Sequence, residues 1–196
     1  GKGIKKAYVW VVTAVNTGLV YYFYHDGSRR EDIILDYIKG YRGAFQSDGF
    51  SPYRKMAKWL LRLACFQHVK RKFLDCGDDF DTKVIVRLAN YIYHQDHKHI
   101  IGVDGWTERD HYKWRQQYAL PVMRIIRKKL ERMAADKSLL PKTEKYDAVH
   151  YMLNEWDGLM NIFTRGDYHL DNNLVERLNR YISLSRRNSL FFGSHT

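Results

Sequence analysis

The sequence predicts an α/β fold in which a mixed sheet, flanked by helices, is interrupted by an all-helical insertion. Two observations carry this prediction. Up to Asp75, runs rich in Val, Tyr and Phe alternate with segments of helical periodicity, which is typical of a sheet with helices on its faces. From Phe80 to Phe163 almost only helical periodicity remains, and this stretch is the predicted insertion.

The first predicted elements are a β-hairpin and a helix. Residues 7–15 and 19–25 are the two strands, because β-branched and aromatic residues dominate both runs and an Asn-Thr-Gly turn separates them. A helix over residues 29–38 follows. Ser28 can cap its first turn, and apolar residues recur along it at helical spacing.

Two short strands and two helices complete this N-terminal part. The predicted strands are residues 43–47, which lead directly into Asp48, and residues 61–65. A helix over residues 51–58 connects them, and a basic helix over residues 66–74 follows the second strand. The first of these strands is expected to be buried.

The insertion is predicted to contain three helices, near residues 81–94, 107–135 and 142–163. Pro121 should kink or split the second helix, because proline lacks an amide hydrogen and clashes with the preceding turn. A last helix is predicted over residues 173–183, with its apolar residues on one face.

Composition indicates a polyanionic partner. The 196 residues include 33 Lys and Arg against 22 Asp and Glu, which gives a formal net charge of +11. Basic side chains displace the counterions condensed on nucleic acid, so this charge favours DNA, although an anionic membrane surface would attract the same patch. No apolar run approaches the roughly 18 residues of a membrane span, and no membrane association is expected. Cys65 and Cys76 are the only cysteines, which favours a reducing compartment.

Two carboxylates are candidate metal ligands. Asp48 follows a predicted strand, whose tip can present a side chain to a cleft, but Asp48-Gly49 is also a common turn dipeptide. Glu176 lies three residues after Asn173, which is the spacing of a helix capping box. It also lies opposite the apolar face of its helix, from where it can point along a cleft. Both alternatives stay open on the residues alone.

Five segments resemble, in the same order, motifs of the IS66 family of bacterial insertion-sequence transposases. The segment QSDGF at residues 46–50 resembles the family's QTDGY, and ACFQHVKRKF at 64–73 resembles GCWAHARRKF. DNNLVER at 171–177 is similar to DNNLAER, and LSRRNSLFFGS at 184–194 is similar to LGRKNWLFAGS. ADKSLLP at 135–141 matches a stretch common in some members. The agreement covers nearly the whole chain, which favours membership over chance.

The resemblance implies a ribonuclease-H-like catalytic core with an acidic triad. Asp48 would be its second member and Glu176 its third, with the helical insertion between them. The family's first aspartate lies in a DETP-like segment before the strand that contains Trp10, and the sequence has no such segment. The first catalytic strand is therefore missing, and a fragment of a longer protein is expected. Its implied parts are the first part of the core (1–76), the insertion (77–165) and the returning catalytic helix with the C-terminal part of the core (166–196).

The implied function is metal-dependent DNA strand cleavage and strand transfer at the ends of an insertion sequence by a DDE-type transposase. Two Mg²⁺ or Mn²⁺ ions are expected with the complete triad, because these ions prefer oxygen ligands and assist in-line displacement at phosphorus. Without the first aspartate, the isolated chain is expected to be inactive. The implied partners are end and target DNA, a transposase oligomer and accessory proteins of the element, in the bacterial cytoplasm at the nucleoid.

Basic residues from two segments are candidate DNA contacts. One set has helical i, i+3, i+4 spacing on the predicted helix at 66–74, where a solvated basic face is an equal alternative. The other set matches the last of the family segments. The six candidates are His68, Arg71, Lys72, Arg186, Arg187 and Asn188.

A histidine-rich stretch invites a zinc interpretation. His94, His97 and His99 lie close in sequence to Asp96 and Asp104. Their spacing fits no closed zinc site, so a solvated loop is the better prediction.

Two other functions stay open beside the transposase. The first is a non-catalytic DNA-binding remnant of a decayed transposable element, in whose gene a stop codon or frameshift would stand upstream. The second is a basic helical scaffold without metal chemistry. A DETP-like segment upstream in the gene would favour the transposase over both.

Overall fold

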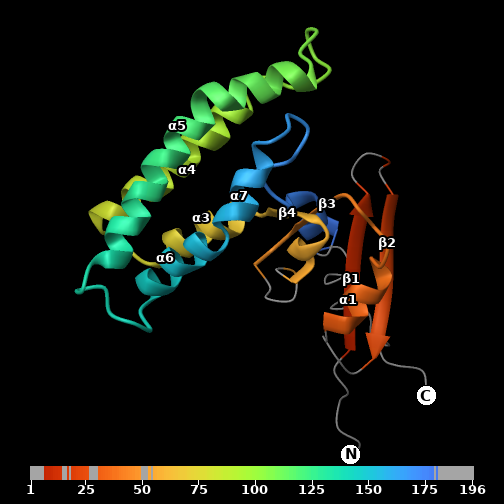
Figure 1. Cartoon of the computed structure of the whole chain (residues 1–196), viewed down its shortest axis with the longest axis horizontal. Coiled ribbons are helices and arrows are strands. Elements are labelled where there is room, and N and C mark those ends of the chain that lie inside the picture. The colour runs from red at the N-terminus through yellow and green to blue at the C-terminus, as the bar shows by residue number, and fades with distance from the viewer. Residues whose placement is uncertain are drawn as a thin grey trace, which may run out of the picture. The chain divides into compact units, whose positions relative to one another are not determined.

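The computed structural model describes residues 7–14, 17, 19–26, 31–49, 53, 55–178 and 180 (Figure 1). The chain divides into two compact units. The smaller combines Gly1–Gly40 with Asn172–Thr196, and the larger is Tyr41–Asp171. Each unit contains strands and helices, so the chain is a mixed α/β protein, as the sequence predicts. The division into core, insertion and returning part stays a prediction.

The smaller unit contains the predicted hairpin and the helix that follows it. Strands β1 (Ala7–Ala14) and β2 (Leu19–Asp26) pair antiparallel along their full lengths. Helix α1 is Glu31–Tyr37, and the first two residues of the predicted helix lie outside the described residues. Ile34 is buried, as its helical spacing indicates, and Ile38 just beyond the helix is buried with it. Local sequence signals therefore specify this unit well.

A parallel strand pair forms the sheet of the larger unit. Strand β3 (Ala44–Ser47) lies beside β4 (Leu61–Ala64), with Ala44 opposite Leu61 and Ser47 opposite Ala64. The connection contains the 3₁₀ turn η1 (Met56–Lys58). Among the described residues, the four strands form two separate two-stranded sheets and not the single mixed sheet that the sequence predicts. The hairpin belongs to the smaller unit and the β3–β4 pair to the larger one.

The larger unit also contains five helices. They are α3 (Phe66–Asp75), α4 (Phe80–Asp96), α5 (Glu108–Ala135), α6 (Glu144–Asn154) and α7 (Trp156–Ile162). Helices α4 and α5 lie side by side as a long hairpin (Figure 1). Buried apolar residues of β4 and of all five helices form one core, including Phe66, Phe73, Ile92, Met123, Met152 and Leu159. The predicted insertion is thus helical and packs on the strand that precedes it.

Side-chain caps define where the insertion helices begin. The Asp79 carboxylate accepts hydrogen bonds from the first turn of α4, and Thr143 caps α6 in the same way. At α5, the Thr107 hydroxyl accepts from the Asp110 amide while the Asp110 carboxylate accepts from the Thr107 amide, which is a capping box. These contacts satisfy backbone donors that a helix start otherwise leaves unpaired.

Two expectations about the insertion helices are corrected. Helix α5 runs unbroken past Pro121, so the proline does not split it. The predicted helix at 142–163 is instead two helices, α6 and α7, which meet at Glu155. Neither glycine nor proline marks this break.

The stretch considered for zinc instead contains a buried ion-pair network. The Asp96 carboxylate accepts from Arg115 through Nε at 2.7 Å and Nη2 at 2.9 Å, and from the Tyr118 hydroxyl at 2.5 Å. His111 Nε2 lies 3.2 Å from the same carboxylate, and Arg115 is only 2% exposed. Asp96 is therefore part of the interior and not of a solvated loop. It ties the end of α4 to the first turns of α5.

The His99 ring lies next to this network but does not approach Asp96 as a co-ligand. It stacks on Trp106 with a centroid distance of 3.9 Å, in the loop between α4 and α5. The His97 ring nitrogen Nδ1 lies 2.7 Å from the Tyr93 carbonyl oxygen. Each of these two rings thus has a structural contact.

Asp96→Asn should destabilise the chain by about 3–5 kcal/mol, because it leaves the buried Arg115 guanidinium without its counter-charge. Urea unfolding at neutral pH measures the change. The matched control is Asp78→Asn, whose side chain is 93% exposed and only 3.5 Å from Lys83; it should change little. Equal unfolding midpoints for the two variants would contradict a stabilising network.

The same network also predicts acid sensitivity. Burial alone would raise the pKa of Asp96, but hydrogen bonds from Arg115 and His111 outweigh it and hold this pKa far below its ordinary value. A carboxylate with a depressed pKa contributes stability that is present above its unfolded-state pKa, near 3.9, and lost as the pH falls toward the folded value. Wild type should lose this contribution below about pH 4, and Asp96→Asn should not.

Candidate active site

Asp48 lies where the sequence predicts it, directly after β3. Ser47, the last residue of this strand, is buried, and it pairs with Ala64 at the end of β4. Asp48 itself is half-buried. It is therefore presented from the tip of a fixed strand, as expected of a ligand at the edge of a sheet.

Three side chains hold the peptide group between Asp48 and Gly49. Its carbonyl oxygen accepts from Arg62 Nη2 at 3.3 Å and from the Ser47 hydroxyl at 3.0 Å. Its amide donates to the Tyr151 hydroxyl oxygen at 3.0 Å. Both polar groups of one peptide unit are thus bound from different elements, which fixes the plane of that peptide.

Arg62 owes its position to a buried ion pair with Glu155. Arg62 is 5% exposed and Glu155 1% exposed, and the guanidinium Nη2 contacts the Glu155 carboxylate directly. The Arg62 carbonyl also accepts from Asn161 Nδ2 at 2.9 Å. Strand β4 is therefore bonded to the junction of α6 and α7.

Tyr151 packs so closely on Gly49 that a larger residue does not fit there. A Cβ added to Gly49 would lie 2.2 Å from the Tyr151 hydroxyl oxygen and 2.5 Å from its ring. Burial and the negative charges of Glu155 and Asp48 raise the pKa of Tyr151 to about 12. Its hydroxyl therefore stays protonated and neutral beside Asp48 at physiological pH.

The segment that carries the second acidic motif starts beside the same strands. Gln46 Nε2 donates to the His169 carbonyl oxygen at 2.7 Å, and the Phe66 amide donates to that of Leu170 at 2.9 Å. The Tyr93 hydroxyl donates to the Asp171 carboxylate at 3.0 Å. These hydrogen bonds join the segment around Gln46 to the segment that leads to Asp171, within the larger unit, although the two lie far apart in the sequence.

Glu176 belongs to the smaller unit, whereas Asp48 belongs to the larger one. The helix that contains Glu176 begins at Asn173, and the Glu176 amide donates to the Asn172 carbonyl at 3.2 Å. This bond makes Asn172 the N-cap, one residue earlier than the capping-box spacing with Asn173 requires. A common cleft for Asp48 and Glu176 stays a prediction.

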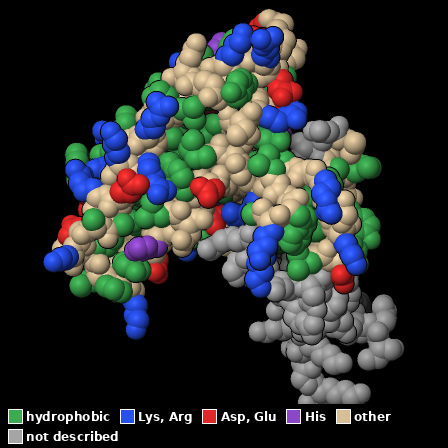
Figure 2. Space-filling model, viewed as in Figure 1, with side chains coloured by type: hydrophobic (Ala, Val, Ile, Leu, Met, Phe, Trp, Pro, Cys, Tyr) green, Lys and Arg blue, Asp and Glu red, His purple; other side chains and the backbone are tan. Residues whose placement is uncertain are grey.

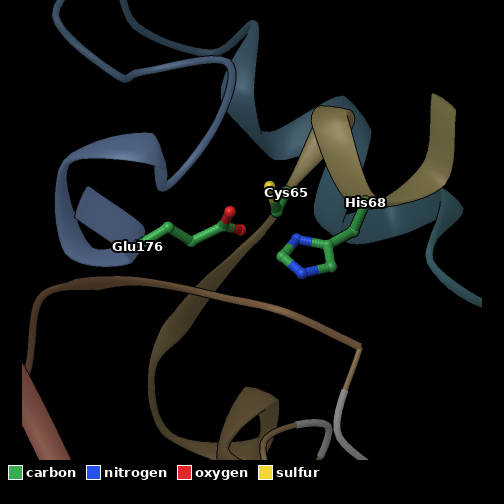
Figure 3. Close-up of side chains that lie close together, drawn as sticks. All are labelled: Cys65, His68 and Glu176. Atoms are coloured by element: carbon green, nitrogen blue, oxygen red, sulfur yellow. The ribbon is translucent and has the colours of Figure 1, made fainter. Parts of the chain in front are cut away.

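The basic candidates divide between described and undescribed residues. Figure 3 shows Cys65 where β4 leads into α3, and His68 in the first turn of α3. Further along α3, Lys72 Nζ lies 5.9 Å from the centre of the Tyr151 ring. The hydroxyl of this tyrosine binds the peptide that follows Asp48. Arg71, on the same helix, is exposed. Arg186, Arg187 and Asn188 lie outside the described residues.

Sequence reasoning missed the residues that surround Asp48. Arg62, Tyr151 and Glu155 carry no motif signal, and only the glycine at position 49 indicates that another group approaches the backbone closely there. Within the described part of the larger unit, no three metal-ligating side chains come together around Asp48. A complete metal site at Asp48 therefore requires ligands from outside this unit.

Comparisons with known proteins identify the family. The sequence model of the Transposase IS66 family matches residues 1–196, and the chain belongs to this family. Membership indicates a function in transposition.

The relatives are longer proteins from Sinorhizobium fredii, all uncharacterised. The protein y4jD is 30% identical over 169 residues, which cover 80% of this chain and 32% of the relative. The protein y4qI is 27% identical over 209 residues, covering 96% and 37%. The chain thus spans about a third of the length of the relatives it matches. No solved structure matches it.

No described helix combines the length and the apolar character needed to cross a bilayer.

Arg62→Met should destabilise the chain by about 3–5 kcal/mol, because it leaves the Glu155 carboxylate buried and unpaired. Adding Glu155→Gln should recover part of this loss by removing that charge. Urea unfolding measures both. The control is Arg127→Met in the exposed pair with Glu131, which should cost less than about 1 kcal/mol. An Arg62→Met chain as stable as the control would show that the pair does not hold β4 to the helices.

Proposed function

We propose that the chain is the catalytic part of a DDE-type transposase that cleaves DNA at the ends of an insertion sequence and joins them to target DNA. The observation that carries the proposal is Asp48, held at the tip of β3 within a chain of the IS66 transposase family. The parallel β3–β4 pair with α3 behind it is compatible with a ribonuclease-H-like core.

Asp48 and Glu176 are the proposed metal ligands, together with an aspartate from elsewhere in the full-length protein. Carboxylate oxygens are the donors that Mg²⁺ and Mn²⁺ prefer, so the donor set fits these ions. Bound by a carboxylate triad, two such ions activate an attacking oxygen and stabilise the leaving oxygen of an in-line displacement at phosphorus. Arg62 is not available to neutralise the Asp48 carboxylate, because its guanidinium is bound to Glu155 and to the Asp48 carbonyl.

The residues around Asp48 have distinct proposed tasks. Tyr151 and Arg62 keep the peptide after Asp48 in one plane, which limits the directions in which its carboxylate can point. His68, Arg71 and Lys72 are proposed to contact DNA phosphate from α3, with Lys72 next to Tyr151. The nucleophile would be water in the first step and the freed 3′-hydroxyl in the second, so no covalent protein intermediate is required.

DNA binding follows from the charge as well as from the family. On the face seen in Figure 2, lysine and arginine side chains are spread over many elements, with acidic side chains among them. Several lysine and arginine side chains among the described residues are engaged in ion pairs, for example Lys129 with Asp81 at 2.5 Å and Lys145 with Asp79 at 2.8 Å. The proposed phosphate contacts are therefore the α3 residues and the Arg186–Arg187–Asn188 segment, and not the basic side of α5.

Asp48→Asn and Glu176→Gln, each in the full-length protein, should abolish Mg²⁺-dependent cleavage of labelled end DNA. The amide removes the negative charge that binds metal and keeps nearly the same shape, so binding of the same DNA in a gel shift should survive. Asp75→Asn, at the exposed C-terminal end of α3, is the matched control and should cleave normally. Full cleavage by both carboxylate variants would refute the triad, and DNA binding without any cleavage by wild type would favour a non-catalytic remnant.

DNA affinity should fall steeply with salt, with a log–log slope of roughly −0.9 for each phosphate neutralised. Arg187→Ala should flatten this slope by about one unit if Arg187 makes one phosphate contact. Fluorescence anisotropy over a salt series gives the slopes. Lys129→Ala is the control, because Lys129 is already paired with Asp81. Identical slopes for wild type and Arg187→Ala would remove this residue from the DNA interface.

A further inference from the structure

The geometry points to a positioning role for the helical insertion in catalysis: Tyr151 and the Arg62–Glu155 pair hold Asp48 in the orientation needed to bind metal. This inference rests on the proposed function, since it concerns the same carboxylate. It adds three residues that lie outside the acidic motifs and assigns the insertion a task at the site.

The peptide unit between Asp48 and Gly49 is bound through both its carbonyl and its amide. The Asp48 carbonyl accepts from Arg62, and the amide of the same peptide donates to Tyr151. A rotation of this peptide would break both hydrogen bonds at once. Because the peptide directly follows the Asp48 Cα atom, its plane restricts where the Asp48 side chain can lie.

The residues that contact Gly49 and Arg62 both lie at the C-terminal end of helix α6. Tyr151 lies in the last turn of α6, and Glu155 follows four residues later, with its amide donating to the Tyr151 carbonyl at 3.0 Å. Residues separated by four positions lie on the same side of a helix. One end of α6 therefore presents both the acceptor for Gly49 and the counter-ion for Arg62.

The buried Arg62–Glu155 ion pair carries a desolvation cost. Burying an ion pair rarely adds net stability over well-packed apolar residues, so its presence needs another reason. Here the pair places a guanidinium donor on the Asp48 carbonyl. Metal-dependent sites need ligands that are held in place before the metal binds, which is the role we assign to it.

Gly49 gives independent support for the contact. Its backbone is not in the left-handed region, so glycine is not required there for conformational reasons. It is required for space, because any Cβ would collide with the Tyr151 ring and hydroxyl. The Asp-Gly sequence after β3 is thus matched to a residue that lies 102 positions further along the chain.

The test is Tyr151→Phe in the full-length protein, which removes one hydroxyl and keeps the ring. Cleavage of labelled end DNA is measured as a function of Mg²⁺ concentration and of DNA concentration. We expect about a five-fold rise in the Mg²⁺ needed for half-maximal cleavage, with kcat reduced and the KM for DNA unchanged, as for the loss of one hydrogen bond that orders a ligand. Tyr146→Phe makes the same change on α6, where the ring lies tilted against the His150 ring at a centroid distance of 4.1 Å, and should match wild type.

A second variant attacks the same contact from the other side. Gly49→Ala should displace Tyr151 and raise the Mg²⁺ requirement at least as much as Tyr151→Phe. The double variant should be no worse than Gly49→Ala alone, because both changes remove one interaction. Thermal melting of each variant identifies a temperature at which all are folded, and the kinetics are compared there.

The outcomes separate this inference from the proposed function. If Asp48→Asn is inactive but Tyr151→Phe has the Mg²⁺ dependence of wild type, the positioning role is wrong and the triad stands. If Tyr151→Phe changes only the KM for DNA, the residue has a structural role and the inference is also overturned. If Asp48→Asn cleaves normally, the proposed function fails first. Binding of Mn²⁺ followed by electron paramagnetic resonance gives a readout without cleavage, and weaker binding by Tyr151→Phe than by Tyr146→Phe supports the inference.

Discussion

The buried ion pair between Arg62 and Glu155 is the contact on which the arrangement of the larger unit depends. Each charge is almost completely removed from water, and neither can stay there without the other. The pair therefore joins strand β4 to the junction of α6 and α7, at a separation of 93 residues in the sequence. The same arginine also donates to the Asp48 carbonyl through its side chain and accepts from Asn161 through its own carbonyl.

A second buried arginine–carboxylate pair fixes the far part of the insertion. Arg115 binds Asp96 with two nitrogens and also donates to the Arg165 carbonyl at 2.8 Å, so it connects α4 and α5 with the chain beyond α7. The long α4–α5 hairpin is thereby tied to the segment that leads into the second acidic motif. The insertion is for this reason an integral part of the unit that holds Asp48 and not an appendage on it.

The sequence predicts those features that local interactions determine. The hairpin strands, α3, α4 and α5 follow from periodicity and from caps such as Thr107, and the position of Asp48 follows from the end of an apolar run. The break at Glu155 could not be predicted, because helical periodicity continues through it. Asp96 was assigned to a solvated loop because its partners Arg115 and Tyr118 lie on another helix.

The Asp-Gly dipeptide after β3 shows how a weak local signal gains meaning from a long-range contact. Read alone, it favours a turn, because glycine tolerates conformations that other residues avoid. The structure gives a different reason for Gly49, since its backbone conformation suits any residue and only the Tyr151 ring excludes a side chain. A glycine needed for space implies that something must approach the backbone closely at that point. Next to Asp48 the approaching group is the Tyr151 hydroxyl, which accepts a hydrogen bond from the Gly49 amide.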